Sequence, residues 1–199
     1  SSTTGTVSVS GTINVGTGCV FVDGSGAVLR IGSSDTFSND LFCTNGGTLE
    51  LSTGITVNWN GNIYDAPHLQ LVPSSFFICN GLISGGTLTM NGSGSCDIHN
   101  GNNSYTAGTT VNDNVLLSGF AAGTPFGTGT LTLNSPGSCT VSAVSGQVSI
   151  GPLVGTGPIS LGNCNLQIDL SVGSGTYDGV ISASPAAVII TGAGIETIT

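Results

Sequence analysis

The sequence predicts an all-β protein built as a parallel β-solenoid, in which short strands wind into stacked coils. Apolar pieces of two to five residues are divided by glycine and asparagine along the whole chain. Within these pieces the apolar residues alternate with a period of two, which is typical of half-buried strands, and no segment has helical spacing. At roughly 20–25 residues per coil, a chain of 199 residues makes roughly eight to ten coils.

The second observation behind this prediction is internal repetition. Asn80–Ser84 (N-G-L-I-S) returns as Asp178–Ser182 (D-G-V-I-S) about 100 residues later. A shorter unit of glycine, threonine and leucine recurs at 46–51, 85–90 and 127–133, and in altered form at 155–161. Repeated short strands with glycine turns and no helices are typical of solenoids.

The repeats predict a single solenoid domain over residues 1–199, with repeat-like units near 79–134 and 153–199. Each coil buries its inward residues against the coils on either side, and its backbone pairs with them at a spacing of about 4.8 Å. A β-sandwich is the structural alternative, because alternation by itself does not distinguish the two folds.

Taken in order, the pattern predicts a strand in each alternating piece: Val7–Val9, Ile13–Val15, Val20–Val22, Val28–Ile31, Gly46–Leu51, Ile55–Trp59, Thr87–Met90 and Cys96–His99. The apolar run Ala186–Ile190 predicts a buried strand. Ser33–Asn39 is polar and is expected to be a loop. Residues 60–75 are irregular and contain two prolines, so we expect a loop that protrudes from the solenoid, where such proteins usually carry function.

Charge excludes several classes of partner. The net charge is −9, and Arg30 is the single basic residue. Nothing is available to neutralise phosphates, so we expect no nucleic acid partner and no attraction to anionic membranes. No apolar run approaches the roughly 18 residues that a spanning helix needs, so we also expect no membrane insertion.

Six cysteines allow three interpretations: small core residues, disulfides between coils or subunits, or a metal site. They are Cys19, Cys43, Cys79, Cys96, Cys139 and Cys164. Each one begins or ends an apolar piece, which favours core residues and leaves disulfides open. A metal site is the weakest interpretation, because there is no C-x-x-C pair and the chain has two histidines. We expect no metal and no cofactor.

One segment resembles a known family. Thr89–Val111 is similar to the passenger-associated strand repeat of bacterial autotransporters, and the N-G-V-I-S piece of that family is echoed at 80–84 and 178–182. The matching residues are Gly92, Gly94, Ile98, Gly101, Asn103, Tyr105, Gly108, Thr109, Thr110 and Val111. Met90 stands where the family has lysine, and Cys96 where it usually has leucine. The resemblance implies a right-handed parallel β-helix in an exported, surface-associated setting.

Residues that could perform chemistry are sparse. The ten acidic residues are scattered singly, whereas glycan-cleaving solenoids need clustered carboxylates. Asp97 and His99 lie two apart on one predicted strand, and we interpret them as outward polar residues rather than an acid–base pair. Trp59, Tyr64 and His68 form a candidate carbohydrate-stacking patch, but we favour the alternative in which Trp59 is a core residue.

These observations predict a non-catalytic structural protein, a rod or filament subunit on the outside of a cell or particle. Neither Ser1–Val9 nor Val188–Thr199 reads as a polar cap, so we expect head-to-tail self-association. The alternative is an adhesin or passenger that binds a host-surface glycan or protein through residues 60–75. We expect no catalytic residues.

Overall fold

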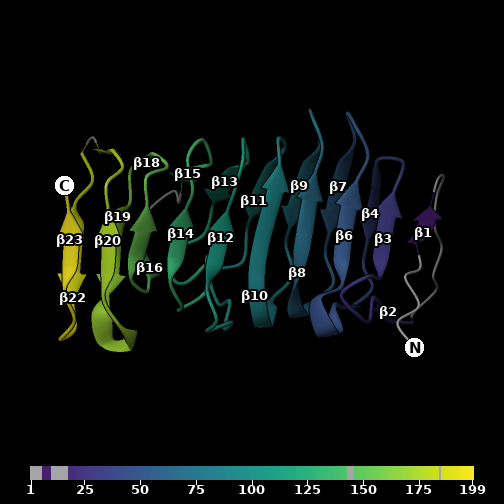
Figure 1. Ribbon diagram of the computed structural model, residues 1–199, viewed down its shortest axis with the longest axis horizontal. Coiled ribbons are helices and arrows are strands. Elements are labelled where there is room, and N and C mark those ends of the chain that lie inside the picture. Colours follow the sequence, from purple (N-terminus) through teal and green to yellow (C-terminus); the bar gives the residue numbers. More distant parts are fainter. Residues whose placement is uncertain (1–5, 10–17, 143–145, 184) are drawn as a thin grey trace.

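The computed structural model describes residues 6–9, 18–142, 146–183 and 185–199, which wind into a parallel β-solenoid of about eight turns (Figure 1). The coils follow one another along the long axis, from β1 beside the N-terminus to β23 at the C-terminus. Helix is limited to two short 3-10 turns in the described part, η1 (Thr44–Gly46) and η2 (Leu170–Val172). The predicted fold and number of coils are confirmed, and the sandwich alternative is wrong because the paired strands run parallel.

Three parallel sheets run along the solenoid. In spatial order the first contains β1 (Thr6–Val9), β3 (Val28–Ile31), β6 (Thr48–Leu51), β8 (Ile63–Leu71), β10 (Ile83–Gly92), β12 (Thr109–Val111), β14 (Leu131–Leu133), β17 (Leu153–Gly155), β20 (Gly175–Tyr177) and β23 (Glu196–Ile198). Beside it, β2 (Val20–Phe21) pairs with β5 (Leu41–Phe42), which pairs with the start of β8.

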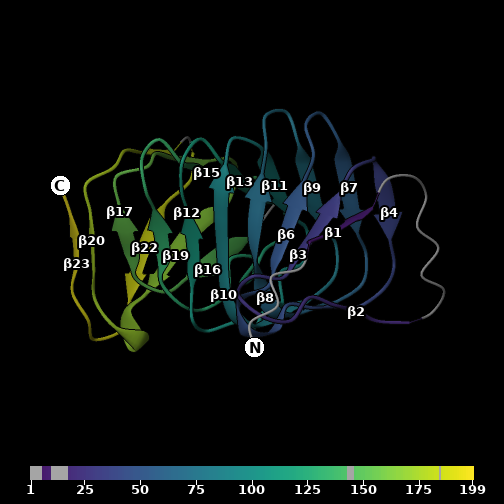
Figure 2. The same cartoon turned by 45° about the vertical axis from the view of Figure 1, so that its right-hand side comes forward.

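The second sheet contains β4 (Asp35–Phe37), β7 (Thr56–Trp59), β9 (Phe76–Cys79), β11 (Ser95–Ile98), β13 (Leu116–Gly119), β15 (Ser138–Val141), β18 (Ile159–Leu161) and β21 (Ile181–Ala183). The third contains β16 (Gln147–Ile150), β19 (Asn165–Asp169) and β22 (Val188–Thr191). Figure 2 shows the first two sheets following the same path along the molecule.

The register fixes the length of each coil. Val28 pairs with Thr48, and Thr48 pairs with His68, a step of 20 residues each time. Further along, Thr110 pairs with Thr132 and Thr132 with Val154, a step of 22 residues. The step changes in the turns and also within β10, where the pairing with β8 shifts by one residue between Gly86 and Thr89, and the inward faces of successive strands still meet.

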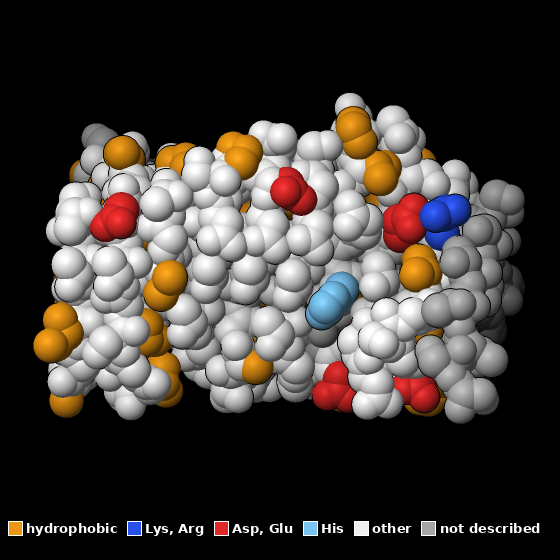
Figure 3. All heavy atoms as spheres, in the orientation of Figure 1, with side chains coloured by type: hydrophobic (Ala, Val, Ile, Leu, Met, Phe, Trp, Pro, Cys, Tyr) orange, Lys and Arg blue, Asp and Glu red, His pale blue; other side chains and the backbone are white. Residues whose placement is uncertain are grey.

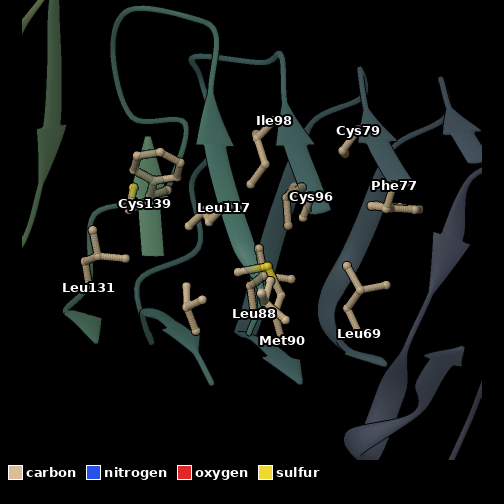
Figure 4. Close-up of a cluster of buried hydrophobic side chains, with 14 of the residues drawn as sticks. Leu69, Phe77, Cys79, Leu88, Met90, Cys96, Ile98, Leu117, Leu131 and Cys139 are labelled. Carbon is tan, nitrogen blue, oxygen red and sulfur yellow. The ribbon is translucent and has the colours of Figure 1, made fainter. Parts of the chain in front are cut away.

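The core consists of rows of inward side chains that continue from coil to coil (Figure 4). In the second sheet, Cys96 lies between Phe77 and Leu117, and each of the three is at most 2% exposed. In the first sheet Met90 lies between Leu69 and Val111, all with no exposure. Each coil therefore removes its neighbour's apolar surface from water, which is the main stabilising contribution.

Outward side chains also form rows. The amide of Asn112 donates from Nδ2 to Asn91 Oδ1 at 2.9 Å and accepts from Asn134 Nδ2 at 2.7 Å. On another face, the rings of Phe21, Phe42 and Tyr64 stack with centroids 4.7 and 4.6 Å apart. Like residues in successive coils therefore hydrogen-bond or stack with one another, because adjacent coils lie one strand spacing apart.

Two predicted loops are strands. Residues 60–75 do not protrude, because β8 occupies most of the segment and pairs with β5, β6 and β10. Its inward residues Ile63 and Leu69 are fully buried, but a polar stretch between them hid the two-residue period. Ser33–Asn39 contains β4, whose Phe37 is buried. The predicted strand Ile13–Val15 lies outside the described residues.

The predicted strand at Ala186–Ile190 is present as β22, but it is not buried. Val188 is 37% exposed and Ile190 is 50% exposed. Both belong to the last coil, where β22 pairs on one side with β19 and nothing in the described part pairs on the other. Alternation predicts a strand but does not predict whether another coil covers it.

Substitutions of Trp59 test how much its packing contributes to the stability of the core. Its ring is fully buried and stacks on Phe37 with centroids 4.9 Å apart, while its indole N–H finds no acceptor among the described residues. We expect Trp59→Ala to lower the free energy of unfolding by about 3–5 kcal/mol. Trp59→Phe keeps the stacking and removes the unpaired N–H, so it should cost much less. Urea denaturation of both variants measures this, and equal costs would contradict the account.

Candidate functional site

The candidate carbohydrate patch does not form as the sequence predicts. Trp59 points into the core with no exposure, so its alternative interpretation as a core residue is correct. Tyr64 and His68 both lie on β8 and reach the outer surface, where Tyr64 is half-buried against the Phe42 ring and His68 is exposed. Two of the three predicted patch residues, Tyr64 and His68, are therefore at the surface.

His68 lines a groove of about 520 Å³ at the corner where η1, β8 and β10 meet. The full lining is Cys43, Thr44, Asn45, Gly46, Asp65, His68, Gly86 and Thr87. Sequence reasoning found His68 and missed the other members. We name this feature the corner groove.

The corner groove exists because one coil lacks side chains where its neighbour has them. Asp65 adopts a left-handed φ of 56°, which bends β8, and the next coil has Gly85 and Gly86 at this point, also with positive φ. A Cβ atom on Gly85 would lie 2.7 Å from Asp65 Oδ1. The consecutive glycines opposite an aspartate are the sequence signal that could have located the groove.

Hydrogen bonds at the edge of the groove determine which donors and acceptors remain available to a ligand. Asp23 accepts from Thr44 Oγ1 at 2.6 Å and from Asn45 Nδ2 at 2.7 Å, and these bonds lower the pKa of Asp23 below its usual value. The hydroxyl proton and an amide proton are therefore directed at Asp23. The Asp65 carboxylate is exposed at the groove and accepts hydrogen bonds, while His68 and Thr87 can each donate or accept one.

The surface elsewhere is sparsely charged, as Figure 3 shows. Arg30, the single basic residue of the chain, forms a two-pronged ion pair with Glu50: Nε lies 2.8 Å from Oε1 and Nη2 lies 3.1 Å from Oε2. The hydrogen bond with Glu50 raises the pKa of Arg30. The remaining acidic residues have no lysine or arginine as counter-charge.

The six cysteines are free thiols, which supports core residues over disulfides. Five are buried, and Cys19 is exposed. Burial raises the pKa of Cys43 and of Cys79 to about 12 and raises the pKa of Cys96 well above its usual value. A thiol needs to ionise to act as a nucleophile, so these three are unreactive at neutral pH.

Geometry explains why Cys96 and Cys139 do not pair. Cys96 and Cys139 occupy the same inward row of the second sheet, but Leu117 lies between them. Two coil spacings put their Cα atoms about 10 Å apart, beyond the roughly 7 Å over which a disulfide can form.

Asp97 and His99 lie in different environments. Asp97 is only 8% exposed, so its interpretation as a solvated outward residue is wrong. Burial raises the pKa of Asp97, and a hydrogen bond with Ser118 opposes that rise. His99 lies against the Phe120 ring with centroids 4.9 Å apart. Among the described residues, no three His, Cys, Asp or Glu side chains are arranged to hold a metal ion.

The two 3-10 turns of the described part are too short to cross a membrane, and no longer helix is found there. Comparisons with models of protein families, with curated proteins and with solved structures find no match. The parallel solenoid is therefore established by its own strand pairing, and the likeness to autotransporter passengers rests on the sequence motif.

The accessibility of the thiols gives a direct test. We expect one thiol group, that of Cys19, to react rapidly with a maleimide in the native protein, and all six to react in denaturant. Mass spectrometry after a short labelling pulse counts the modified groups. Cys19→Ser should abolish the native reaction. Rapid native labelling of this variant would contradict the burial of the other five.

Proposed function

We propose that the chain is a non-catalytic structural rod on the outside of a cell or particle, and that its last coil stacks on a second copy. The single observation that carries this proposal is the apolar surface of the last coil. Val180, Ile190 and Ile195 are 66%, 50% and 71% exposed. Large apolar side chains at such exposure favour a contact that covers them, and we propose that a second copy supplies it.

The backbone at this end supports the same proposal. β21, β22 and β23 each stand last in their sheets, so each presents unpaired N–H and C=O groups along one edge. Parallel coils pair with such edges everywhere else in the solenoid, and an incoming coil would cover Ile190 and Ile198 as those residues cover Ile168 and Tyr177. Head-to-tail stacking of identical rods is the repetition of this contact between chains.

The setting outside the cell is supported by the sequence. The segment Thr89–Val111 resembles the strand repeat of autotransporter passengers, which are exported. A rod with few charges and with most of its thiols inside the core suits a durable scaffold. We therefore propose a passenger-like structural protein.

An adhesin that binds a glycan or protein is the second candidate, and the corner groove favours it. The groove is lined by His68 and Asp65, which belong to the segment 60–75 that the sequence analysis singled out for binding. Trp59 is not part of its lining. A rod can carry such a site on its side, so the two candidates are compatible.

Stacking predicts concentration-dependent filaments. We expect negative-stain electron microscopy to show rods joined end to end, and light scattering to show mass rising with concentration. Ile195→Asp puts a charge into the interface and should return the protein to monomers. Phe120→Asp is the matched control, since Phe120 is 40% exposed directly after β13, away from the last coil. A wild-type protein that stays monomeric at every concentration would disprove the stacking.

Glu196 gives the last coil a pH dependence. Its side chain folds back over Gly175, where Oε2 accepts from the Leu153 N–H at 3.3 Å, and Oε1 is buried with no partner among the described residues. Burial raises the pKa of Glu196 above its ordinary value of 4.5. The folded state therefore holds this proton more tightly than the unfolded state does.

The sign of the effect follows from this difference. The stabilisation from protonated Glu196 is complete below pH 4.5 and is lost as pH rises through the raised pKa. Glu196→Gln removes the charge, so we expect it to raise the free energy of unfolding at neutral pH and to flatten its dependence on pH above 4.5. Urea denaturation across that range measures both. A variant less stable than wild type at neutral pH would contradict the prediction.

A further inference from the structure

The corner groove has the size of a small-molecule site. Its volume of about 520 Å³ falls within the range of ligand pockets, roughly 300–1,000 Å³. Gly85 lies beside the groove, where a Cβ atom would lie 2.7 Å from Asp65 Oδ1. The strands β8 and β10 pair on both sides of a register shift between Gly86 and Thr89, so the scaffold holds the groove at this irregular point.

The chemistry of the lining selects a ligand that donates hydrogen bonds. Thr44 and Asn45 direct protons at Asp23, which leaves their oxygens as acceptors. Asp65 adds an exposed carboxylate, which accepts the strongest bonds from a charged donor. Hydroxyl groups and an ammonium group meet this requirement, and His68 and Thr87 can exchange further hydrogen bonds with hydroxyl groups.

The charge of the chain also favours a ligand that carries a positive charge. Its net charge is −9, and the single basic residue, Arg30, is engaged with Glu50. Asp65 lines the groove, Asp23 accepts hydrogen bonds from the lining residues Thr44 and Asn45, and no lysine or arginine is among the lining residues. The resulting field attracts cations and repels anions.

We propose that the corner groove binds a saccharide that carries a free amine. The ammonium group would lie at Asp65, and the sugar hydroxyls would donate to the oxygens of Thr44 and Asn45. A lysine side chain of a protein is less well matched, because its four-carbon stem packs along apolar surface and this lining is mostly polar. The site deepens the second candidate function and is independent of stacking, which involves β21 to β23.

Three tetramers separate the contributions of charge and sugar. Titration calorimetry at about pH 6, where an amine is protonated, compares glucosamine tetramer, N-acetylglucosamine tetramer and tetralysine. We expect glucosamine tetramer to bind and the other two to bind at least about tenfold more weakly, because each lacks one half of the recognition. If tetralysine bound as tightly as glucosamine tetramer, the proposal that the ligand is a saccharide would be wrong. If N-acetylglucosamine tetramer bound as tightly, the proposed role of the ammonium charge would be wrong.

Asp65→Asn is the decisive variant. Asparagine tolerates the left-handed backbone and removes the charge, so the fold should persist while affinity for glucosamine tetramer falls by about tenfold or more. Asp113→Asn is the matched control: Asp113 is exposed, has a φ of 54° and lies in a different coil. Urea denaturation verifies that both variants are folded. Absence of binding by wild type, or an equal loss in both variants, would overturn the proposal whether or not filaments form.

Discussion

Parallel pairing of each coil with the next is the interaction on which the rest of this structure depends. Its constant register places every inward side chain over the same position of the preceding coil, so that rows such as Phe77, Cys96 and Leu117 form a continuous core. The same register aligns Asn91, Asn112 and Asn134 into a hydrogen-bonded row on the outside. Without that repetition, neither row would bring its members within contact distance.

The sequence predicted the fold class, the coil number and most strands, because alternation and glycine turns are local signals. β6 and β7 fall inside the pieces predicted at Gly46–Leu51 and Ile55–Trp59. It misjudged β4 and β8, where prolines or polar residues interrupt the two-residue period. It also left open whether Trp59 lies inside, since an outward and an inward aromatic residue have the same local pattern.

The corner groove was beyond local reasoning for a different reason. Its lining comes from three successive passes of the chain, near Thr44, Asp65 and Gly86. These positions can be recognised as neighbours only once the coil length is known to within a residue, and that length varies between 19 and 22 residues in the pairings described above. Individual residues such as His68 can be suspected from sequence, but their partners follow from the register.

The scarcity of basic residues has a consequence for proteolysis. Proteases that cleave after lysine or arginine find one such bond in the whole chain, after Arg30. That residue sits within β3, with β1 bonded on one side and β6 on the other, and its guanidinium is held by Glu50. A digestive enzyme of this specificity would have to pull a strand out of the sheet before it could cut, so the chain resists such enzymes by composition as well as by folding.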